Sequence, residues 1–241
     1  MEVVPLRKTF TLRTPILRPV ATRVYLIRHG ATELSAEDRF AGSVDVLLSD
    51  EGREQARKLG ARLAGQPMAA VYASPMKRTV ATAELVAQPH GLTVQTVDAV
   101  REIAHGRWEG KRRAEVEAEW AAEYERWEHD PYTFAPVGGE SGLQVIARAL
   151  PALMQLIETH ENRQFAVVSH KATIRLLLCT LLAFDPRRYR DRLDQSPAAL
   201  NVFDFQDLDH ARLTLFNDVS HYAPTPEIPK QRLSRAWDVK Q

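Results

Sequence analysis

The sequence predicts an α/β fold, a three-layer α/β/α sandwich with a mostly parallel sheet. Two observations lead to this prediction. Short runs of β-branched or aromatic residues alternate along the 241 residues with segments of helical periodicity, which is typical of a sheet with helices on its faces. Three of the predicted strands also end directly in a polar cluster, as is common where the carboxyl ends of strands form a ligand site.

The first strand and helix are indicated by hydrophobicity and by a capping residue. Residues 24–27 (VYLI) form an apolar run of strand length. Ser49 is predicted to cap a helix, because Asp50 and Glu51 would follow in its first turn, where acidic side chains favour the positive end of the helix dipole. That helix presents an apolar face made of Ala56, Leu59 and Leu63.

The second strand, residues 70–73, leads into a helix that is predicted to start at Ser74 and Pro75 and to run through MKRTVATAELVAQ. A third strand is predicted at residues 93–97. Residues 112–128 are charged and favour a helical insertion over one end of the sheet. We expect packing roles for its three aromatic residues at helical spacing, Trp120, Tyr124 and Trp127.

The last third of the domain repeats the alternation. A helix at residues 143–158 has an apolar stripe made of Leu143, Ile146, Leu150, Leu153 and Ile157. Residues 165–168 form a strand followed directly by the apolar helix ATIRLLLCTLLA, in which Cys179 is expected to be buried. Two strands, ALNVFDF and RLTLF, close the domain. Asp207 and Asp209 fall in the turn between them, so local backbone hydrogen bonding is expected rather than metal binding.

Composition excludes several classes of partner. Lys plus Arg number 32 against 31 for Asp plus Glu, so no net field draws the chain to nucleic acid or to a membrane. The single cysteine fits a reducing compartment, and a cytoplasmic location is expected.

Residues 1–21 are predicted to be an N-terminal arm, 22–222 the domain and 223–241 a C-terminal tail. The oligomeric state stays open, a homo-oligomer included.

Polar residues gather at the ends of three predicted strands. RHG (28–30) follows the first strand, SPMKR (74–78) the second, and SHK (169–171) the strand at residues 165–168. In an open α/β sheet such ends share one edge, so we expect the three segments to converge. The N-termini of the two following helices, together with Arg28 and Arg78, favour a bound anion. The residues therefore predict a phosphate or carboxylate site.

Four segments resemble the motifs of the histidine phosphatase (phosphoglycerate-mutase-like) superfamily. YLIRHGATE resembles its arginine-histidine-glycine signature, SPMKRTVATAEL its second arginine motif, REIAHGRWEG its acidic motif and VVSH its second histidine motif, in the family's order. The resemblance spans residues 23–221 and includes GGES. It implies a phosphoglycerate-mutase-like fold with the insertion over the active site. It also implies a phosphomonoesterase that acts on a small phosphorylated metabolite with no metal or cofactor.

The resemblance further implies roles for five residues. His29 is the nucleophile that becomes phosphohistidine, Arg28 and Arg78 hold the phosphate, His170 stabilises the transferring group, and Glu102 protonates the leaving alcohol and later activates water. The chemistry is consistent with these roles. A neutral imidazole is nucleophilic, and phosphoryl transfer asks mainly for positioning and charge stabilisation.

Two positions depart from the family pattern. The family often has an asparagine near the position of Ser35, so Ser35 or Thr32 is expected to contact the phosphate instead. Lys171 stands where glycine is common, and it either points to solvent or recognises a second anionic group of the substrate.

Two other functions stay open, a cofactor-dependent phosphoglycerate mutase and a non-catalytic phospho-ligand-binding module. The segment GRWEGKRR resembles the phosphatase branch more than the mutases.

Overall fold

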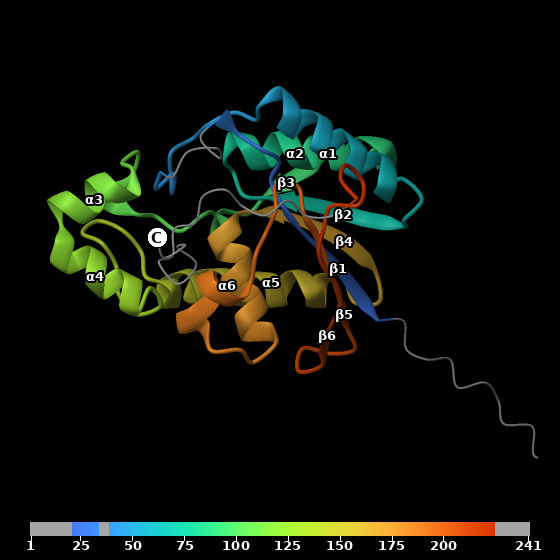
Figure 1. Cartoon of the computed structure of the whole chain (residues 1–241). Coiled ribbons are helices and arrows are strands. Elements are labelled where there is room, and N and C mark those ends of the chain that lie inside the picture. The colour runs from blue at the N-terminus through green and yellow to red at the C-terminus, as the bar shows by residue number, and fades with distance from the viewer. Residues whose placement is uncertain (1–20, 34–38, 225–241) are drawn as a thin grey trace, which may run out of the picture.

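A six-stranded sheet organises the residues that this computed structural model describes, 21–33 and 39–224 (Figure 1). The strands are β1 (Thr22–Arg28), β2 (Met68–Ala73), β3 (Val94–Thr96), β4 (Gln164–Ser169), β5 (Leu200–Phe205) and β6 (Ala211–Asp218). The helices are α1 (Asp50–Leu63), α2 (Lys77–Ala87), α3 (Arg113–Glu119), α4 (Ala121–His129), α5 (Gly142–Thr159), α6 (Lys171–Leu181) and α7 (Tyr189–Arg192). Residues 1–20 of the predicted arm and 225–241 of the predicted tail lie outside the described residues.

The strand order is β3-β2-β4-β1-β5-β6, and the sheet is mostly parallel as predicted. The strand β4 pairs in parallel with β1 and β2, whereas β5 runs antiparallel to both of its neighbours. Register places Arg28 opposite Ser169, and Ala73 opposite Val168. The carboxyl ends of β1, β2 and β4 therefore lie at one edge of the sheet, where three of the predicted motif segments begin.

Helices cover both faces of the sheet, which makes the predicted three layers. Successive side chains of β1 point to opposite faces, as the pleat requires. Ile27 packs in the core cluster that contains Leu59 of α1, whereas Leu26 packs in the cluster that contains Leu153 of α5 and Ile174 of α6. Figure 1 shows α1 and α2 on one side of the strands and α5 and α6 on the other. Within the described ranges, no helix is long and apolar enough to cross a membrane.

Two helix starts show where local prediction succeeds and where it fails. Ser49 caps α1 as predicted, since its hydroxyl accepts the Gly52 N–H at 3.1 Å. The predicted start of α2 at Ser74 is wrong, because the helix begins at Lys77. Ser74 instead continues the sheet, with its N–H donating to the Val168 carbonyl at 3.0 Å. Its hydroxyl is thereby left for a contact with another strand end.

The predicted insertion forms α3 and α4 and has a small core of its own. Phe40, Trp108, Val116, Tyr124 and Trp127 make up that cluster, and Trp120 packs against it. The packing role expected for the three aromatic residues is therefore confirmed. Figure 1 shows α3 and α4 together, on the side of the molecule away from the start of β1.

Three smaller expectations are settled by burial and hydrogen bonding. Cys179 is buried, and burial raises the pKa of its thiol to about 11. Asp207 accepts the backbone N–H groups of Asp209 and His210, both at 2.9 Å, as expected for a turn residue. The stripe predicted for α5 is partly wrong, because Leu143 is 49% exposed. The buried face of α5 is rotated toward Val145, Ile146, Ala149, Leu153 and Ile157.

Candidate active site

His29 directly follows β1 and is oriented by its own backbone. Its Nδ1 lies 2.7 Å from the Gly30 carbonyl oxygen. Because a carbonyl oxygen can only accept a hydrogen bond, Nδ1 carries the proton and Nε2 keeps its lone pair. Gly30 is required by close packing, since a Cβ there would lie 2.4 Å from the Gly52 carbonyl oxygen. The turn thus presents one defined face of the imidazole.

The surroundings of His29 keep its ring neutral. The side chain is buried, with 6% of its surface exposed. Burial holds the pKa of His29 well below 6.5, and the positive charges of Arg28 and Arg78 lower this pKa further. At neutral pH the imidazole is therefore unprotonated at Nε2 and available as a nucleophile.

His170 brings a second imidazole to the same place from the end of β4. Its ring centroid lies 5.2 Å from that of His29, with the planes inclined by 62°. Its Nε2 is 2.8 Å from the Ser74 hydroxyl, which comes from the end of β2. Its Nδ1 is buried with no hydrogen-bond partner among the described residues. The ends of β1, β2 and β4 therefore converge as predicted, and an imidazole nitrogen is left for a ligand.

Two arginines stand beside His29, each anchored by backbone carbonyl groups. Arg28 donates to the Gln195 carbonyl at 2.6 Å, and burial lowers its pKa to about 10, so it stays cationic at neutral pH. Arg78 donates to the carbonyls of Val44 and Gly42, at 2.8 and 3.1 Å. Holding the guanidinium groups in fixed orientations prepares them for an anion with tetrahedral oxygens.

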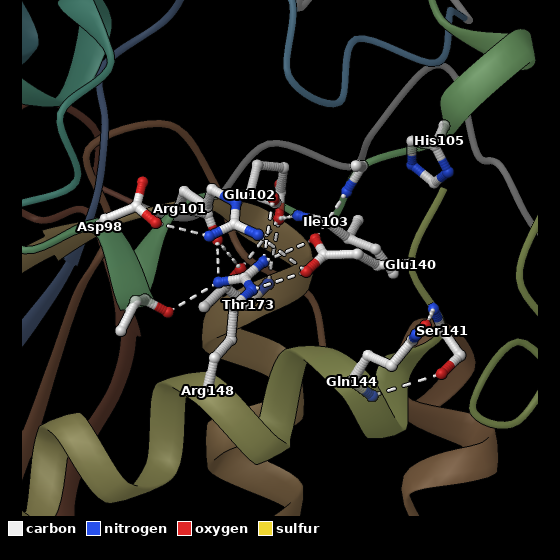
Figure 2. A network of polar contacts seen from close by, with 12 residues as sticks. Asp98, Arg101, Glu102, Ile103, His105, Glu140, Ser141, Gln144, Arg148 and Thr173 are labelled. Atoms are coloured by element: carbon white, nitrogen blue, oxygen red, sulfur yellow. Dashed lines mark hydrogen bonds and ion pairs between the residues drawn. The ribbon is translucent and has the colours of Figure 1, made fainter. Parts of the chain in front are cut away.

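Glu102 lies at the N-terminus of α6. Its carboxylate accepts the backbone N–H groups of Ile103 at 3.0 Å, Thr173 at 3.1 Å and Ala172 at 3.2 Å. The surface pairing with Arg101 that would make Glu102 an ordinary exposed residue is not formed. Figure 2 shows Arg101 directed instead to Asp98 and Glu140, at 2.6 and 3.1 Å.

Both helix N-termini were expected to offer free N–H groups to an anion. This expectation is wrong for three of these N–H groups, because carboxylates of the chain already accept them. Glu102 takes the N–H groups of Ala172 and Thr173 in α6, and Asp45 accepts the Lys77 N–H of α2 at 2.8 Å. The physical reason is the same preference of a helix N-terminus for negative charge, satisfied here within the chain. Positive charge for a bound anion therefore comes from the arginine side chains.

Thr32, Ser35 and Lys171, the candidates at positions that depart from the family pattern, have different outcomes. Thr32 is buried and forms an isolated bridge with Leu48. Ser35 lies outside the described residues. Lys171 is 34% exposed, with its Nζ 3.7 Å from an Asp194 carboxylate oxygen. Burial and the charges of Arg175 and Arg28 lower the pKa of Lys171 to about 7. The lysine therefore lies near Arg28 and is only partly protonated at neutral pH.

Sequence reasoning missed three residues that the structure adds to this site. Ser74 is predicted only as a helix start within the segment SPMKR, and the prediction does not include its contact with His170. Glu140 and Arg148 form an ion pair at 2.8 Å beside the loop that carries Glu102. Glu140 belongs to the GGES segment, but nothing local in the sequence connects it with Arg148.

The buried histidines predict a stability that falls in mild acid. His29, His105 and His170 have folded-state pKa values below 6.5, mainly through burial, and that of His105 is about 4. Below pH 6.5 the unfolded chain binds protons that the folded chain does not, so the stabilisation present above that pH is lost as the pH falls. We expect the free energy of unfolding to drop by at most about 1.4 kcal/mol per pH unit for each such histidine.

Urea unfolding at about pH 7 and about pH 5 measures this dependence. The variant His105→Gln removes one titrating ring away from His29 and should show a shallower decrease than the parent. An unfolding free energy that stays constant between the two pH values would contradict the prediction.

Comparisons with known proteins agree with this geometry. Residues 24–219 match the family model of the histidine phosphatase superfamily (branch 1). Phosphoserine phosphatase 1 of Hydrogenobacter thermophilus is 33% identical over 167 residues, which cover 69% of this chain and 79% of the relative. Glucosyl-3-phosphoglycerate phosphatase of Mycobacterium tuberculosis is 30% identical over 170 residues, 67% of this chain and 76% of the relative. The solved structure of Bacillus stearothermophilus YhfR superposes with a TM-score of 0.78 at 29% identity, covering 83% of this chain and 99% of that one.

Proposed function

Because the chain belongs to the histidine phosphatase superfamily (branch 1), we propose that it is a phosphomonoesterase that hydrolyses a small-molecule phosphate ester through a phosphohistidine on His29. One observation carries the proposal for this residue. The Nδ1 hydrogen bond to Gly30 and the lowered pKa of the ring leave Nε2 as a neutral, oriented nucleophile beside two arginines. The same arrangement requires no metal ion to activate the attacking group.

In the first half-reaction Nε2 of His29 attacks phosphorus, the P–N bond forms and the ester P–O bond breaks. Arg28 and Arg78 hold the non-bridging oxygens and stabilise their charge through the transition state. His170 presents an imidazole nitrogen that has no hydrogen-bond partner among the described residues, which suits a further hydrogen bond to the transferring group. Glu102 gives a proton to the departing alkoxide.

In the second half-reaction Glu102 takes a proton from water as the water oxygen attacks phosphorus. The P–N bond breaks, inorganic phosphate leaves, and His29 returns to its neutral form. The proton gained by Glu102 is the one donated to the next leaving group, so the cycle balances. The backbone N–H groups of Ala172 and Thr173 hold the carboxylate in place for this step.

The main alternative is a phosphoglycerate mutase, which passes the phosphoryl group back to an acceptor alcohol rather than to water. Purified protein is assayed for release of inorganic phosphate from a panel of phosphorylated metabolites, and in parallel for isomerisation of 3-phosphoglycerate with a bisphosphate primer. Both assays contain excess chelator. We expect phosphate release without isomerisation. Isomerisation without net phosphate release would favour the mutase, and activity that a divalent ion has to restore would contradict the metal-independent mechanism.

We propose that Lys171 recognises a second anionic group of the substrate, such as a carboxylate. Its position beside Arg28 and its partial exposure support this role. The phosphoserine named for one relative and the phosphoglycerate ester named for the other each carry a carboxylate as well as a phosphate. Ion pairing with Asp194 in the free protein keeps the ammonium group near this position until a substrate carboxylate competes for it.

Replacing Lys171 with alanine should lower kcat/KM on carboxylated phosphoesters by about tenfold, the loss of one partly exposed ion pair, and leave neutral phosphoesters almost unchanged. The ratio of the two values of kcat/KM is the measurement. Lys58→Ala, on the exposed face of α1, is the matched control and should not move this ratio. An unchanged ratio in Lys171→Ala would place the lysine outside substrate recognition.

We further propose that residues 22–222 form the catalytic domain, which the family match over residues 24–219 supports. Phosphate contact by Thr32 or Ser35 remains a prediction, as does a cytoplasmic location, which rests on the single, buried cysteine.

A further inference from the structure

Glu140 and Arg148 form a two-residue clamp under the loop that carries Glu102. The Nε and one terminal nitrogen of Arg148 donate to the two carboxylate oxygens of Glu140, at 2.8 and 2.9 Å. Each side chain is only 15% exposed. A bidentate pair of this kind fixes both the distance and the relative orientation of the two groups. We call these two residues the Glu140–Arg148 clamp.

The remaining donors of Arg148 reach backbone carbonyl groups on the amino side of Glu102 and at Glu102 itself. Arg148 donates to the carbonyls of Ala99 at 2.7 Å, Arg101 at 2.9 Å and Glu102 at 3.1 Å. On the other side of Glu102, a carboxylate oxygen of Glu140 accepts the Ala104 N–H at 3.1 Å. Figure 2 shows Arg148 extending from α5 to this loop, with Glu140 beside it. The clamp thus holds the backbone both before and after Glu102.

The start of α5 places both members of the clamp. Ser141 caps the helix and forms a capping box with Gln144, which fixes the residue just before it, Glu140. Gly139 lets this segment approach the loop closely, because a Cβ there would lie 2.7 Å from the Ala104 carbonyl oxygen. Arg148 follows the cap by about two turns, so it points from the same helix toward the same loop.

The carboxylate of the clamp is ionised at neutral pH. Burial raises the pKa of the Glu140 carboxyl, but the hydrogen bond and charge of Arg148 outweigh burial and leave this pKa below its ordinary value. The donors of Arg148 are directed to fixed acceptors in the protein, so the side chain is not available to bind a phosphate itself. Its hydrogen bonds reach the loop before Glu102, and Glu102 itself, through main-chain carbonyl groups of residues 99–102.

We propose that Glu140 and Arg148 are positioning residues for proton transfer, which keep the Glu102 carboxylate at the N-terminus of α6 beside the leaving-group oxygen. This inference rests on the proposed role of Glu102 as the acid. A loop held at three carbonyls and one N–H cannot shift without breaking charge-assisted bonds, and a displacement of about 1 Å at a reacting group costs roughly 10²-fold in rate. The GGES segment thereby gains a role in the reaction of this protein.

The dependence of the rate on the leaving group separates positioning from simple support of the fold. In single-turnover measurements of phosphohistidine formation, Arg148→Met should reduce the rate on glycerol phosphate, an alkyl ester that needs the acid, by roughly ten- to 10²-fold. Nitrophenyl phosphate, whose leaving group departs without a proton, should lose much less. In the double variant with Glu102→Gln, Arg148→Met should cause no further loss on glycerol phosphate, because the step that it supports is already absent.

Two further variants complete the experiment. Arg148→Lys keeps the charge but cannot form the fork, so it should show the same substrate dependence even where Arg148→Met does not fold. Arg101→Met is the matched control, since Arg101 also pairs with Glu140 but makes none of the carbonyl contacts of Arg148, and it should affect both substrates little.

Equal losses on the two esters, or losses that add to those of Glu102→Gln, would overturn the clamp as a positioning device. The parallel measurement on Glu102→Gln alone tells apart the two ways to fail. If that variant shows no leaving-group dependence, the acid role itself is wrong and the inference falls with it. If it does and the Arg148 variants do not, only the inference falls.

Discussion

Replacing His29 with alanine is expected to reduce turnover by roughly 10⁴-fold or more on every phosphate ester. The imidazole is the group that we propose to form the covalent bond to phosphorus, and no other unprotonated nucleophile takes its position among the described residues. His170, the neighbouring ring, engages Ser74 through Nε2 and comes from a different strand end. Nitrophenyl phosphate should lose as much as an alkyl ester, because the loss lies in nucleophilic attack and not in leaving-group protonation.

A quenched-turnover experiment tests the same residue directly. Protein stopped during turnover with radiolabelled substrate should carry a phosphate that is stable in base and labile in acid, located on the peptide that contains His29. His210→Ala, which alters an exposed histidine in the turn between β5 and β6, is the matched control and should keep both activity and label. Circular dichroism of His29→Ala checks that it is folded. Turnover that persists in this folded variant would refute the mechanism.

Replacing Glu102 with glutamine is expected to slow hydrolysis of alkyl phosphates by roughly 10²- to 10⁴-fold. Glutamine retains one oxygen that can accept the Thr173 N–H, whereas its amide NH2 group replaces the carboxylate oxygen that accepts the Ala172 N–H. It can neither donate nor take up the proton that the reaction moves. The loss on nitrophenyl phosphate should be much smaller in the half-reaction that forms phosphohistidine. Steady-state and single-turnover rates on the two esters are the measurement.

Glu54 provides a control for the Glu102→Gln variant, because its carboxylate lies outside the active site. Glu54→Gln removes a charge from the exposed face of α1, where Glu54 pairs with Arg57, and should leave both rates unchanged. If Glu102→Gln lowered the formation of phosphohistidine equally on both esters, the residue would support the structure of the site without giving a proton. The proposed nucleophile would be unaffected by that outcome.

The fold class and most element positions were predictable because their signals are local. The alternation of apolar runs with helical periodicity marks β1, β2, β4 and the hairpin of β5 and β6, and Ser49 with two following acidic residues marks a helix cap. The convergence of Arg28, His29 and His170 was predictable as well. It follows from the rule that parallel strands bring their carboxyl ends to one edge.

The errors in prediction arose where a distant partner competed with a local preference. Ser74 has the residue type of a helix cap, but its hydroxyl bonds to His170, which lies 96 positions further along the chain. Leu143 has the spacing of a core residue, yet the packed face of α5 is rotated away from it. In both cases a tertiary contact overrode the local pattern.

Local sequence patterns therefore specify the set of helices and strands, and the types of residue that lie at one edge of the sheet. Both depend on short-range periodicity and strand polarity, which neighbouring residues encode. The contacts that hold these groups in position depend instead on how distant segments pack together. Glu102 caps a helix some 70 positions away, and Arg148 holds a loop that precedes it by 46 to 49 positions. Such contacts form only when folding brings separate segments together, and no local pattern specifies which donor meets which acceptor.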